Sequence, residues 1–488
     1  MRIARKFFIL FSFSLIVLFS CTKDFLEVDD NTEFYRQSYV KDLSTMKDFL
    51  NGIYLRYAVN MYHSNAQAYN ELIADNLRPI GQTDGVLLPH YSWSQQSDLK
   101  DRQELPGVDP EATAMNPLWR MGYLVIRSCN FVIEETEKYR KENPGIADDI
   151  KGQAYAIRAL THFQLVNVFA QSYKFTSDAS HPGIPYITTS DISDPISRQT
   201  VAEVYANIIS DYEQAANLLS TQVSDVQFVN VRAVKALLAR MYLFKEDYNK
   251  AKQFAVEVMS GGRLMTIDRG YPDAVFMHVK PAETEVLFQL SPMGTPAIRT
   301  RFLATILNGP VIRLIATSDI ADILNEDPDD VRCKWITKDE DRWIVSKYPM
   351  NAAPDVTPPL SNPAAAYYPN IIRLSEMWLT AAEASAEMGD DAAARTYLNE
   401  IRKRSSPDAE DILSVGDDLL DAIYKERRKE LSFEGLRMPD LKRWKLPVKR
   451  KDFLFDYAKE LPYGSNKSIA PLPPFDVTLA DLGQNIGY

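Results

Sequence analysis

Residues 371–404 read IIRLSEMWLTAAEASAEMGDDAAARTYLNEIRKR, and this stretch decides the fold. Its pattern predicts a helix over Ile371–Met388, a tight Gly-Asp turn and a second helix over Asp391–Arg404. Small residues such as Ala384 in the first helix face larger ones such as Tyr397 in the second. Small side chains let two helices approach closely while large ones fill the space between them, so the stretch predicts a helical hairpin.

Two further segments show the same pattern. Gly152–Phe169 is expected to pair with Val201–Leu219, and Val231–Phe244 with Tyr248–Met259. Repeated hairpins of this kind are typical of tetratricopeptide-like structures. Additional helices are predicted at Leu43–Tyr57, Ala66–Leu77 and Leu118–Glu137. We therefore expect a mainly α fold, in which degenerate tetratricopeptide-like helix pairs form a scaffold, with long irregular loops and a few short strands.

Helical periodicity lapses in two long excursions, at about 79–117 and 261–369. The second contains many prolines and two β-like runs, Val286–Leu290 and Trp343–Tyr348. Loops of this length in a compact protein are usually functional or disordered, and the aromatic residues here argue against disorder. We expect both excursions to belong to a single domain that covers residues 34–488.

The N-terminus has the features of an export signal. Three basic residues precede the apolar run Phe7–Phe19, which has the length of a signal-peptide core and is too short to cross a bilayer. The sequence Leu18-Phe19-Ser20-Cys21 then resembles a bacterial lipobox. This resemblance implies that residues 1–20 form a lipoprotein signal peptide, that Cys21 is lipidated and that 21–33 is a lipidated tether. The alternative is an ordinary secretory signal with a chance cysteine.

Composition narrows the possible functions. The 488 residues carry a net charge of −11, which disfavours nucleic acid as a partner. After the leader, no stretch is long and apolar enough to cross a membrane. Besides Cys21 the chain has Cys129 and Cys333, which we expect to be unpaired, although export would permit a disulfide.

Enzyme and metal motifs are not found in the sequence. It lacks G-x-S-x-G, H-E-x-x-H and P-loop patterns, and its five histidines show no metal-ligand spacing. We therefore expect no catalytic residue, metal or cofactor. Carboxylate pairs that meet only in space remain an open alternative for glycan cleavage. Asp327, Asp329 and Asp330 could hold calcium but lack the EF-hand pattern, so a solvated turn is favoured.

The segment Glu426–Gly435 reads ERRKELSFEG and places charges on an apolar helix face. Arg427 shares that face with Ile423 and Leu431, and a buried charge needs a partner. Glu376 or Glu383 of the preceding helix could supply it. Glu430 lies one helical turn from Arg427. We interpret Arg427, Glu430, Glu383 and Glu376 as structural ion pairs rather than as catalytic or ligand-binding groups.

This same segment, with Arg437, Asp440–Trp444 and the closing Gln484–Tyr488, resembles the SusD/RagB family of Bacteroidetes outer-membrane lipoproteins. Ile486 departs from the pattern, because the family usually has proline there. Other matching positions are Asp24–Glu27, Asn51–Tyr54, Trp119…Tyr123…Ile126…Asn130, Ala154…Arg158-Ala159, Arg198–Val201 and Arg373…Glu376…Ala384.

The resemblance implies a SusD-like fold, an outer-membrane lipid anchor facing the cell exterior and capture of a nutrient oligomer without catalysis. The ligand would be an oligosaccharide or, as in RagB-like members, a peptide. The implied partner is a SusC-like TonB-dependent transporter. Two alternatives differ in class: a glycan-cleaving lipoprotein enzyme, and a helical scaffold that organises other envelope proteins.

Aromatic residues in the excursions are the candidate ligand contacts, because sugars lay their C–H faces on Trp and Tyr rings. The first excursion offers Trp93, Tyr91 and His90. Trp93 is favoured, because the family often places ligand contacts in this loop. The second excursion offers a further three: Trp335, Trp343 and Tyr348. For each of these residues the alternative role is packing in the core.

Overall fold

The computed structural model describes residues 39–62, 64–83, 86–96, 115–222, 225–276, 285–291, 303–309, 311–348 and 368–488. Cys21 and the tether 21–33 lie outside these residues.

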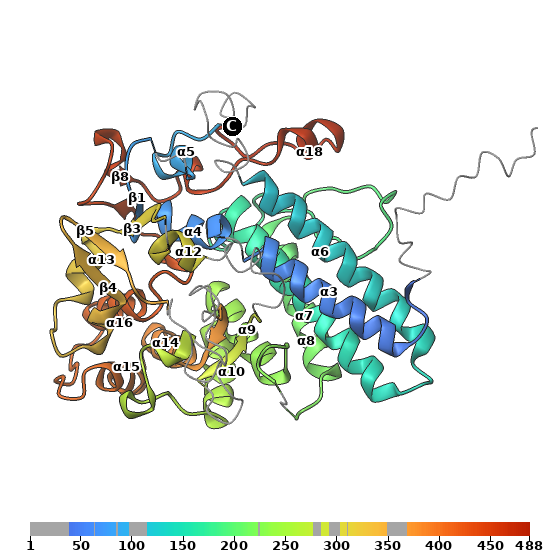
Figure 1. Ribbon diagram of the computed structural model, residues 1–488, viewed down its shortest axis with the longest axis horizontal. Helices are drawn as coiled ribbons and strands as arrows, with labels where there is room; N and C mark the ends of the chain where they lie inside the picture. The colour runs from blue at the N-terminus through green and yellow to red at the C-terminus, as the bar shows by residue number, and fades with distance from the viewer. Residues whose placement is uncertain are drawn as a thin grey trace, which may run out of the picture.

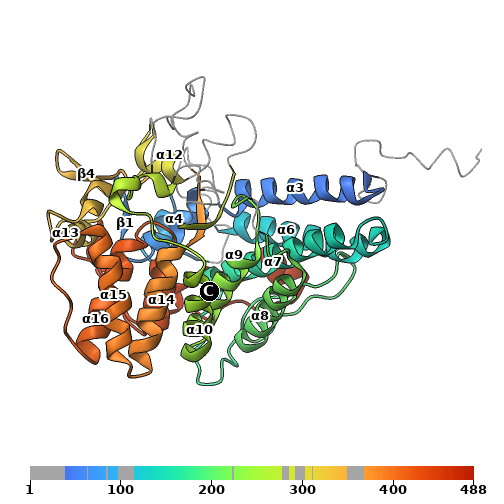
Figure 2. The ribbon, with the colours of Figure 1, turned by 90° about the horizontal axis from the view of Figure 1, so that it is seen from below.

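A row of packed helices forms the scaffold (Figures 1 and 2). Each member of the row packs against the next in the order α3, α6, α7, α8, α9, α10, α14, α15, α16. Their bounds are α3 Leu43–Asn60, α6 Asn116–Glu135, α7 Pro144–Phe169, α8 Val201–Leu218, α9 Val231–Phe244, α10 Tyr248–Ser260, α14 Leu374–Glu387, α15 Asp391–Ser405 and α16 Asp417–Glu430. The three predicted hairpins, α7 with α8, α9 with α10 and α14 with α15, are confirmed.

Local signals explain where these helices begin and end. The side chain of Asn143 accepts a hydrogen bond from the backbone N–H of Ile146, so α7 begins at Pro144, earlier than predicted. Thr200 and Glu203 form a capping box at the start of α8. The turn between α14 and α15 contains Gly389 with φ +78°, a left-handed conformation that glycine adopts without steric cost.

The chain enters the scaffold at the start of α3, beside the far end of α6. The Tyr139 hydroxyl donates to the carbonyl of Val40 over 2.9 Å. The backbone N–H of Leu43 donates to the Glu142 carboxylate over 3.1 Å. Both partners lie just after the C-terminus of α6, so the first described residues are attached to that end of the helix.

The second excursion interrupts the scaffold rather than extending it. It leaves after α10 and returns at α14, and these two helices nevertheless pack side by side. Strand β2 (Val286–Gln289) pairs antiparallel with β6 (Asn370–Arg373) where the chain returns. The prediction that a helix starts at Ile371 was therefore wrong, because Asn370–Arg373 pairs with a distant strand and α14 starts at Leu374.

The two excursions also share a four-stranded antiparallel sheet, which the sequence did not reveal. Its strand order is β1-β3-β5-β4, with β1 Leu77–Pro79, β3 Leu314–Ala316, β5 Arg342–Val345 and β4 Ile336–Asp339. Helix α4 covers Ser64–Leu72, and the predicted helix end at Leu77 was wrong because Leu77 pairs with Ala316. Short helices α5 Leu88–Tyr91, α12 Leu303–Asn308 and α13 Ser318–Leu324 flank the sheet.

The C-terminal residues return across the scaffold. They contain α17 Arg437–Arg443, β7 Val448–Lys449, β8 Glu460–Leu461 and α18 Pro474–Leu479. In Figure 1 the last of these, α18, lies above α6. One cluster of buried apolar residues extends from Val40 to Leu482. Cys129 and Cys333 are free thiols. Within the described ranges no helix is both long and apolar enough to cross a bilayer.

Candidate functional site

Trp93, the favoured ligand contact, belongs to the core. Its side chain is 9 % exposed, and its indole N–H donates to the carbonyl of Ile73 over 3.0 Å. The guanidinium of Arg450 lies 4.1 Å from the ring centroid. The prediction of ligand stacking was wrong for this residue, because the ring is already packed within the protein.

The neighbouring candidates are covered in the same way. Tyr91 is fully buried, and Arg450 lies 4.2 Å from its ring centroid. His90 is buried against Tyr69, and burial, with a smaller effect of Lys467, lowers its pKa to about 3, so its imidazole is neutral. Neither side chain presents a face to a ligand, which corrects the assignment of both.

The second group of aromatics is also largely internal. Trp335 is fully buried with the Lys347 ammonium 3.9 Å from its ring centroid. Tyr348 is buried and its hydroxyl donates to the carbonyl of Phe433. These two assignments are corrected as well. Trp343, on β5, is half-buried, and the Lys338 ammonium lies 5.5 Å from its ring centroid.

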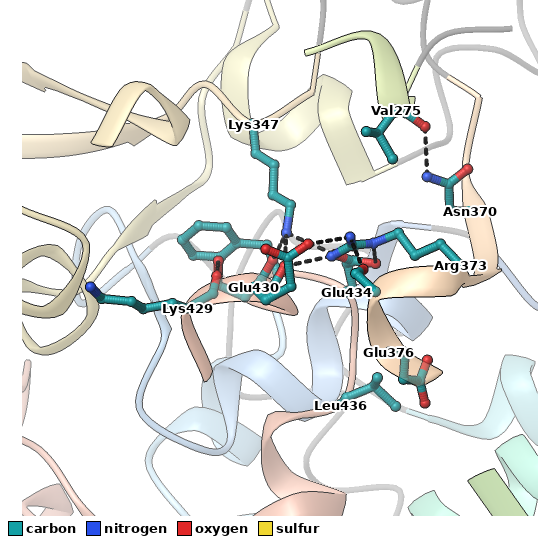
Figure 3. A network of polar contacts seen from close by, with 12 residues as sticks. Val275, Lys347, Asn370, Arg373, Glu376, Lys429, Glu430, Glu434 and Leu436 are labelled. Carbon is teal, nitrogen blue, oxygen red and sulfur yellow. Dashed lines mark hydrogen bonds and ion pairs between the residues drawn. The ribbon is translucent and has the colours of Figure 1, made fainter. Parts of the chain in front are cut away.

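Lys347, which lies over the Trp335 ring, belongs to a buried network of ion pairs (Figure 3). Glu430 is fully buried and pairs with three guanidiniums: Arg332 at 3.1 Å, Arg404 at 2.7 Å and Arg373. Burial alone would raise the pKa of Glu430, but Arg404, Arg373 and Arg332 outweigh it and hold that pKa well below its ordinary value. The carboxylate is therefore ionised and serves as the centre of the network.

Glu434 extends the network toward the second excursion. Its carboxylate lies 2.7 Å from Arg373 and 2.8 Å from Lys347. The Lys347 ammonium also donates to the carbonyls of Glu430 and Ser432, at 3.0 and 2.8 Å. Figure 3 shows Lys347 and Arg373 converging on Glu430 and Glu434 from different elements. The network thus joins the end of α16 to β6 and the strand region.

The partners of Arg427 are only partly those expected. Its guanidinium lies 2.9 Å from Asp440 and 3.7 Å from Glu376. Glu383 instead pairs with Arg443, and the indole N–H of Trp444 donates to it over 2.8 Å. Asp440 was missed because it follows on α17, after a change of chain direction. All these groups are enclosed by protein, which fits a structural role.

An apolar groove of about 970 Å³ lies between α6, α18 and the connection from α7 to α8. Sequence reasoning did not find it. Its apolar lining includes Trp119, Tyr123, Ile187, Pro473, Phe475 and Leu479. Three parts of the chain line it, one as a floor and two as walls. Both walls are fixed by hydrogen bonds.

The floor is an aromatic pair on α6. The rings of Trp119 and Tyr123 meet edge to face with centroids 4.8 Å apart, and Phe169 supports Trp119 from below at 4.9 Å. The Tyr123 hydroxyl donates to the carbonyl of Pro185 over 2.8 Å. Trp119 is 3 % exposed.

One wall is the connection between α7 and α8. The Asn130 amide donates to the carbonyls of Ile187 and Thr189, at 3.1 and 2.8 Å. Arg158 donates to the side-chain oxygen of Asn130 over 2.7 Å and forms a bidentate pair with Asp211 at 2.6 Å. Asn130 and Arg158 therefore hold this connection against α6.

The other wall is the C-terminal segment. The Gln484 side chain both accepts from and donates to the backbone of Leu472, at 2.8 and 2.9 Å. The Asn485 amide donates to the carbonyls of Phe169 and Ala470, at 2.9 and 2.8 Å. Gln484 and Asn485 thus bind the backbone after α18 to the backbone before it. The adjacent pair Pro473-Pro474 restricts the backbone further.

Charged groups stand at the rim. Arg120 and Arg127 project from α6, and Arg127 donates to the carbonyl of Asp191. Asp476 of α18 also lines the groove, and burial raises the pKa of its carboxyl above the ordinary value. Among the described residues no group of three or more His, Cys, Asp or Glu is placed to hold a metal ion.

Two family models match the chain. The model described as "Starch-binding associating with outer membrane" matches residues 24–243, and the model described as "SusD family" matches residues 343–470. A SusD-like protein P2 of Formosa agariphila is 25 % identical over 91 % of both chains.

Solved structures share the fold. A SusD superfamily protein of Bacteroides thetaiotaomicron is 26 % identical, with a TM-score of 0.79 over 91 % of this chain and all of that one. A laminarin-binding SusD-like protein is 19 % identical and shares the fold, with a TM-score of 0.71 over 92 % of this chain and all of that one. The order of the motifs, the row of helix pairs and these matches agree along nearly the whole chain, which therefore belongs to the SusD/RagB family.

Proposed function

We propose that this protein is a lipid-anchored binding protein of the outer membrane, which captures an oligosaccharide at the cell exterior and delivers it unchanged to a SusC-like TonB-dependent transporter. The observation that carries this proposal is membership of the SusD/RagB family along nearly the full chain, including a match to a model described as starch-binding. The description of one structural neighbour as laminarin-binding adds support for a glucan as ligand.

Export and anchoring rest on the N-terminal sequence. The leader, the lipobox-like Leu18–Cys21 and the acidic tether fit a protein held outside the cell by acyl chains. Metabolic labelling with a palmitate analogue is expected to label the full chain but not the Cys21→Ala variant. Failure to label the wild-type chain would contradict the lipid anchor without bearing on ligand binding.

Ligand capture is tested with the purified chain that starts after Cys21. Affinity electrophoresis and a glycan array, including starch and laminarin, should show reversible binding of at least one polysaccharide. Incubation with that polysaccharide should release no new reducing ends. Absence of binding across the array, or release of reducing ends, would contradict the proposal of a non-catalytic glycan-binding protein.

Delivery requires a membrane partner. Detergent extraction of the native membrane, with capture through an affinity tag on this chain, is expected to retain a TonB-dependent barrel in a stoichiometric complex. Retention of several envelope proteins without a barrel would favour the scaffold alternative instead.

A further inference from the structure

We propose that the groove between α6 and α18 is the binding site for a short oligosaccharide segment. This inference rests on the proposed function, since it assigns a location to the glycan binding proposed above. None of the six aromatics singled out from the sequence lines this groove.

The size of the groove fits an oligomer. Ligand pockets usually enclose about 300 to 1,000 Å³, and this groove, at about 970 Å³, lies at the upper end of that range. A single sugar unit would leave much of it unfilled. A stretch of several linked units would be surrounded by the floor and both walls.

Its lining has the chemistry of sugar recognition. Sugar rings carry apolar C–H faces that lie on aromatic rings, and the groove offers Tyr123 on its floor and Phe475 on its wall. Phe475 is 73 % exposed, although transfer of a phenyl ring out of water lowers the free energy. Leu479, one helical turn later, is 69 % exposed. Both side chains are therefore exposed apolar surface that a bound ligand would cover.

Polar groups accompany these apolar surfaces. Trp119 lines the groove floor, and its indole carries one N–H donor. A ligand hydroxyl can accept a hydrogen bond from such a donor. Asp476 and Arg120 add an acceptor and a donor at the rim. This alternation of apolar faces with single polar groups suits a hydroxyl-bearing chain.

The walls are preorganised, which favours a ligand over a flexible protein partner. Asn130 fixes one wall and Gln484 with Asn485 fixes the other, so little conformational entropy is lost when a ligand binds. A stable protein interface usually buries more than about 1,000 Å² over a broad, flatter surface. A concave site with fixed walls is the arrangement typical of small ligands.

The test compares variants of the chain that starts after Cys21 against the polysaccharide that binds most tightly in the glycan array, or against laminarihexaose if laminarin is bound. Phe475→Ala removes an exposed ring and should leave the fold intact. Trp119→Phe keeps an aromatic floor and removes the N–H donor. Ile486→Ala is the matched control, because Ile486 is 78 % exposed on the same C-terminal segment and does not line the groove.

We expect Phe475→Ala and Trp119→Phe each to weaken binding about five-fold or more in isothermal titration, and Ile486→Ala to leave it within two-fold. If the wild-type chain binds a glycan and both groove variants bind it equally well, the inference is wrong while the proposed function stands. If Phe475→Ala instead loses the transporter and keeps the glycan, the groove is a protein-docking surface. If the wild-type chain binds no glycan, the proposed function itself fails.

Discussion

The guanidinium of Arg332 lies 3.1 Å from the carboxylate of Glu430, although 98 positions separate the two residues in the chain. Both side chains are at most 1 % exposed. Arg332 belongs to the second excursion and Glu430 to the last helix of the row, so this pair joins the inserted sheet region to the scaffold.

Replacing Glu430 by Gln should destabilise the protein strongly. Arg332, Arg373 and Arg404 would then share a buried site without their common counter-charge, and breaking a buried pair typically costs about 3–5 kcal/mol. Chemical denaturation followed by circular dichroism measures this loss. Asp411→Asn breaks the half-exposed pair with Lys403 and serves as control, with an expected change below about 1 kcal/mol.

Arg427→Ala should also lower stability by about 3 kcal/mol or more. Its loss leaves the buried carboxylate of Asp440 with Arg443 as its remaining cationic partner. Lys425→Ala, which removes a half-exposed cation from the same helix, is the control. A melting temperature for Arg427→Ala equal to that of wild type would show that the pair with Asp440 contributes little.

The variant Trp93→Ala tests whether Trp93 is a core residue or a ligand contact. We expect a loss of about 3–5 kcal/mol in stability, because a packed aromatic side chain and its hydrogen bond to Ile73 are removed. The affinity of the folded protein for its glycan should change less than two-fold. A large loss of affinity at unchanged stability would restore Trp93 as a ligand contact.

Asp75 should make stability depend on pH in the acid range. Burial alone would raise its pKa, but Arg428 and Arg437 outweigh burial and lower the pKa to about 2. The Arg437 pair is bidentate, at 2.7 and 2.9 Å. In the unfolded chain an aspartate titrates near 3.9, so the unfolded state takes up the proton first as the pH falls. This contribution is therefore complete above about pH 4 and is lost as the pH falls toward 2.

The variant Asp75→Asn cannot titrate at this position. Its deficit in unfolding free energy relative to wild type should therefore shrink by about 1 kcal/mol between pH 5 and pH 3. Urea denaturation at the two pH values measures the difference. A deficit that stays constant would mean that Asp75 does not have the low pKa.

Gln484→Ala should loosen the C-terminal wall of the groove. The Gln484 side chain accepts from the N–H of Leu472, so hydrogen exchange at Leu472 should accelerate at least ten-fold, which corresponds to a loss of about 1.4 kcal/mol in local stability. Exchange in α9, which this residue does not contact, should stay unchanged. Equal exchange at Leu472 in both proteins would show that the wall does not depend on this clamp.

The helix pairs could be predicted because their signals are local. Alanine and aromatic spacing within 374–404 specifies both helices and their mutual packing, whereas Ile371–Arg373 belongs to a strand whose partner lies far along the chain. Strand β1 could not be predicted, because Leu77 continues an apolar helical pattern and its partner Ala316 lies far along the sequence. The charged face of α16 indicated buried ion pairs, but Asp440 and Arg332 approach it only in the folded chain.

The candidate site was the least predictable part. Trp93 and Trp335 lie in segments without periodicity, which suggested surface loops, yet these segments fold back and bury both rings. The groove is formed by α6, the connection between α7 and α8, and the C-terminal segment, which meet only in space. Asn130, Gln484 and Asn485, which hold its walls, belong to motifs that resemble the family. A motif does not tell which backbone carbonyl or N–H each side-chain amide will bind.

The position of the groove along α6 has a mechanical consequence. The chain enters beside Tyr139 and Glu142, past one end of this helix, whereas Trp119 and Tyr123 lie near the other end. A helix of 20 residues is about 30 Å long. With the pivot at the point where the chain enters beside Tyr139 and Glu142, α6 works as a lever arm. A turn of about 20° at the pivot would sweep the groove through an arc of about 10 Å, roughly the width of one helix.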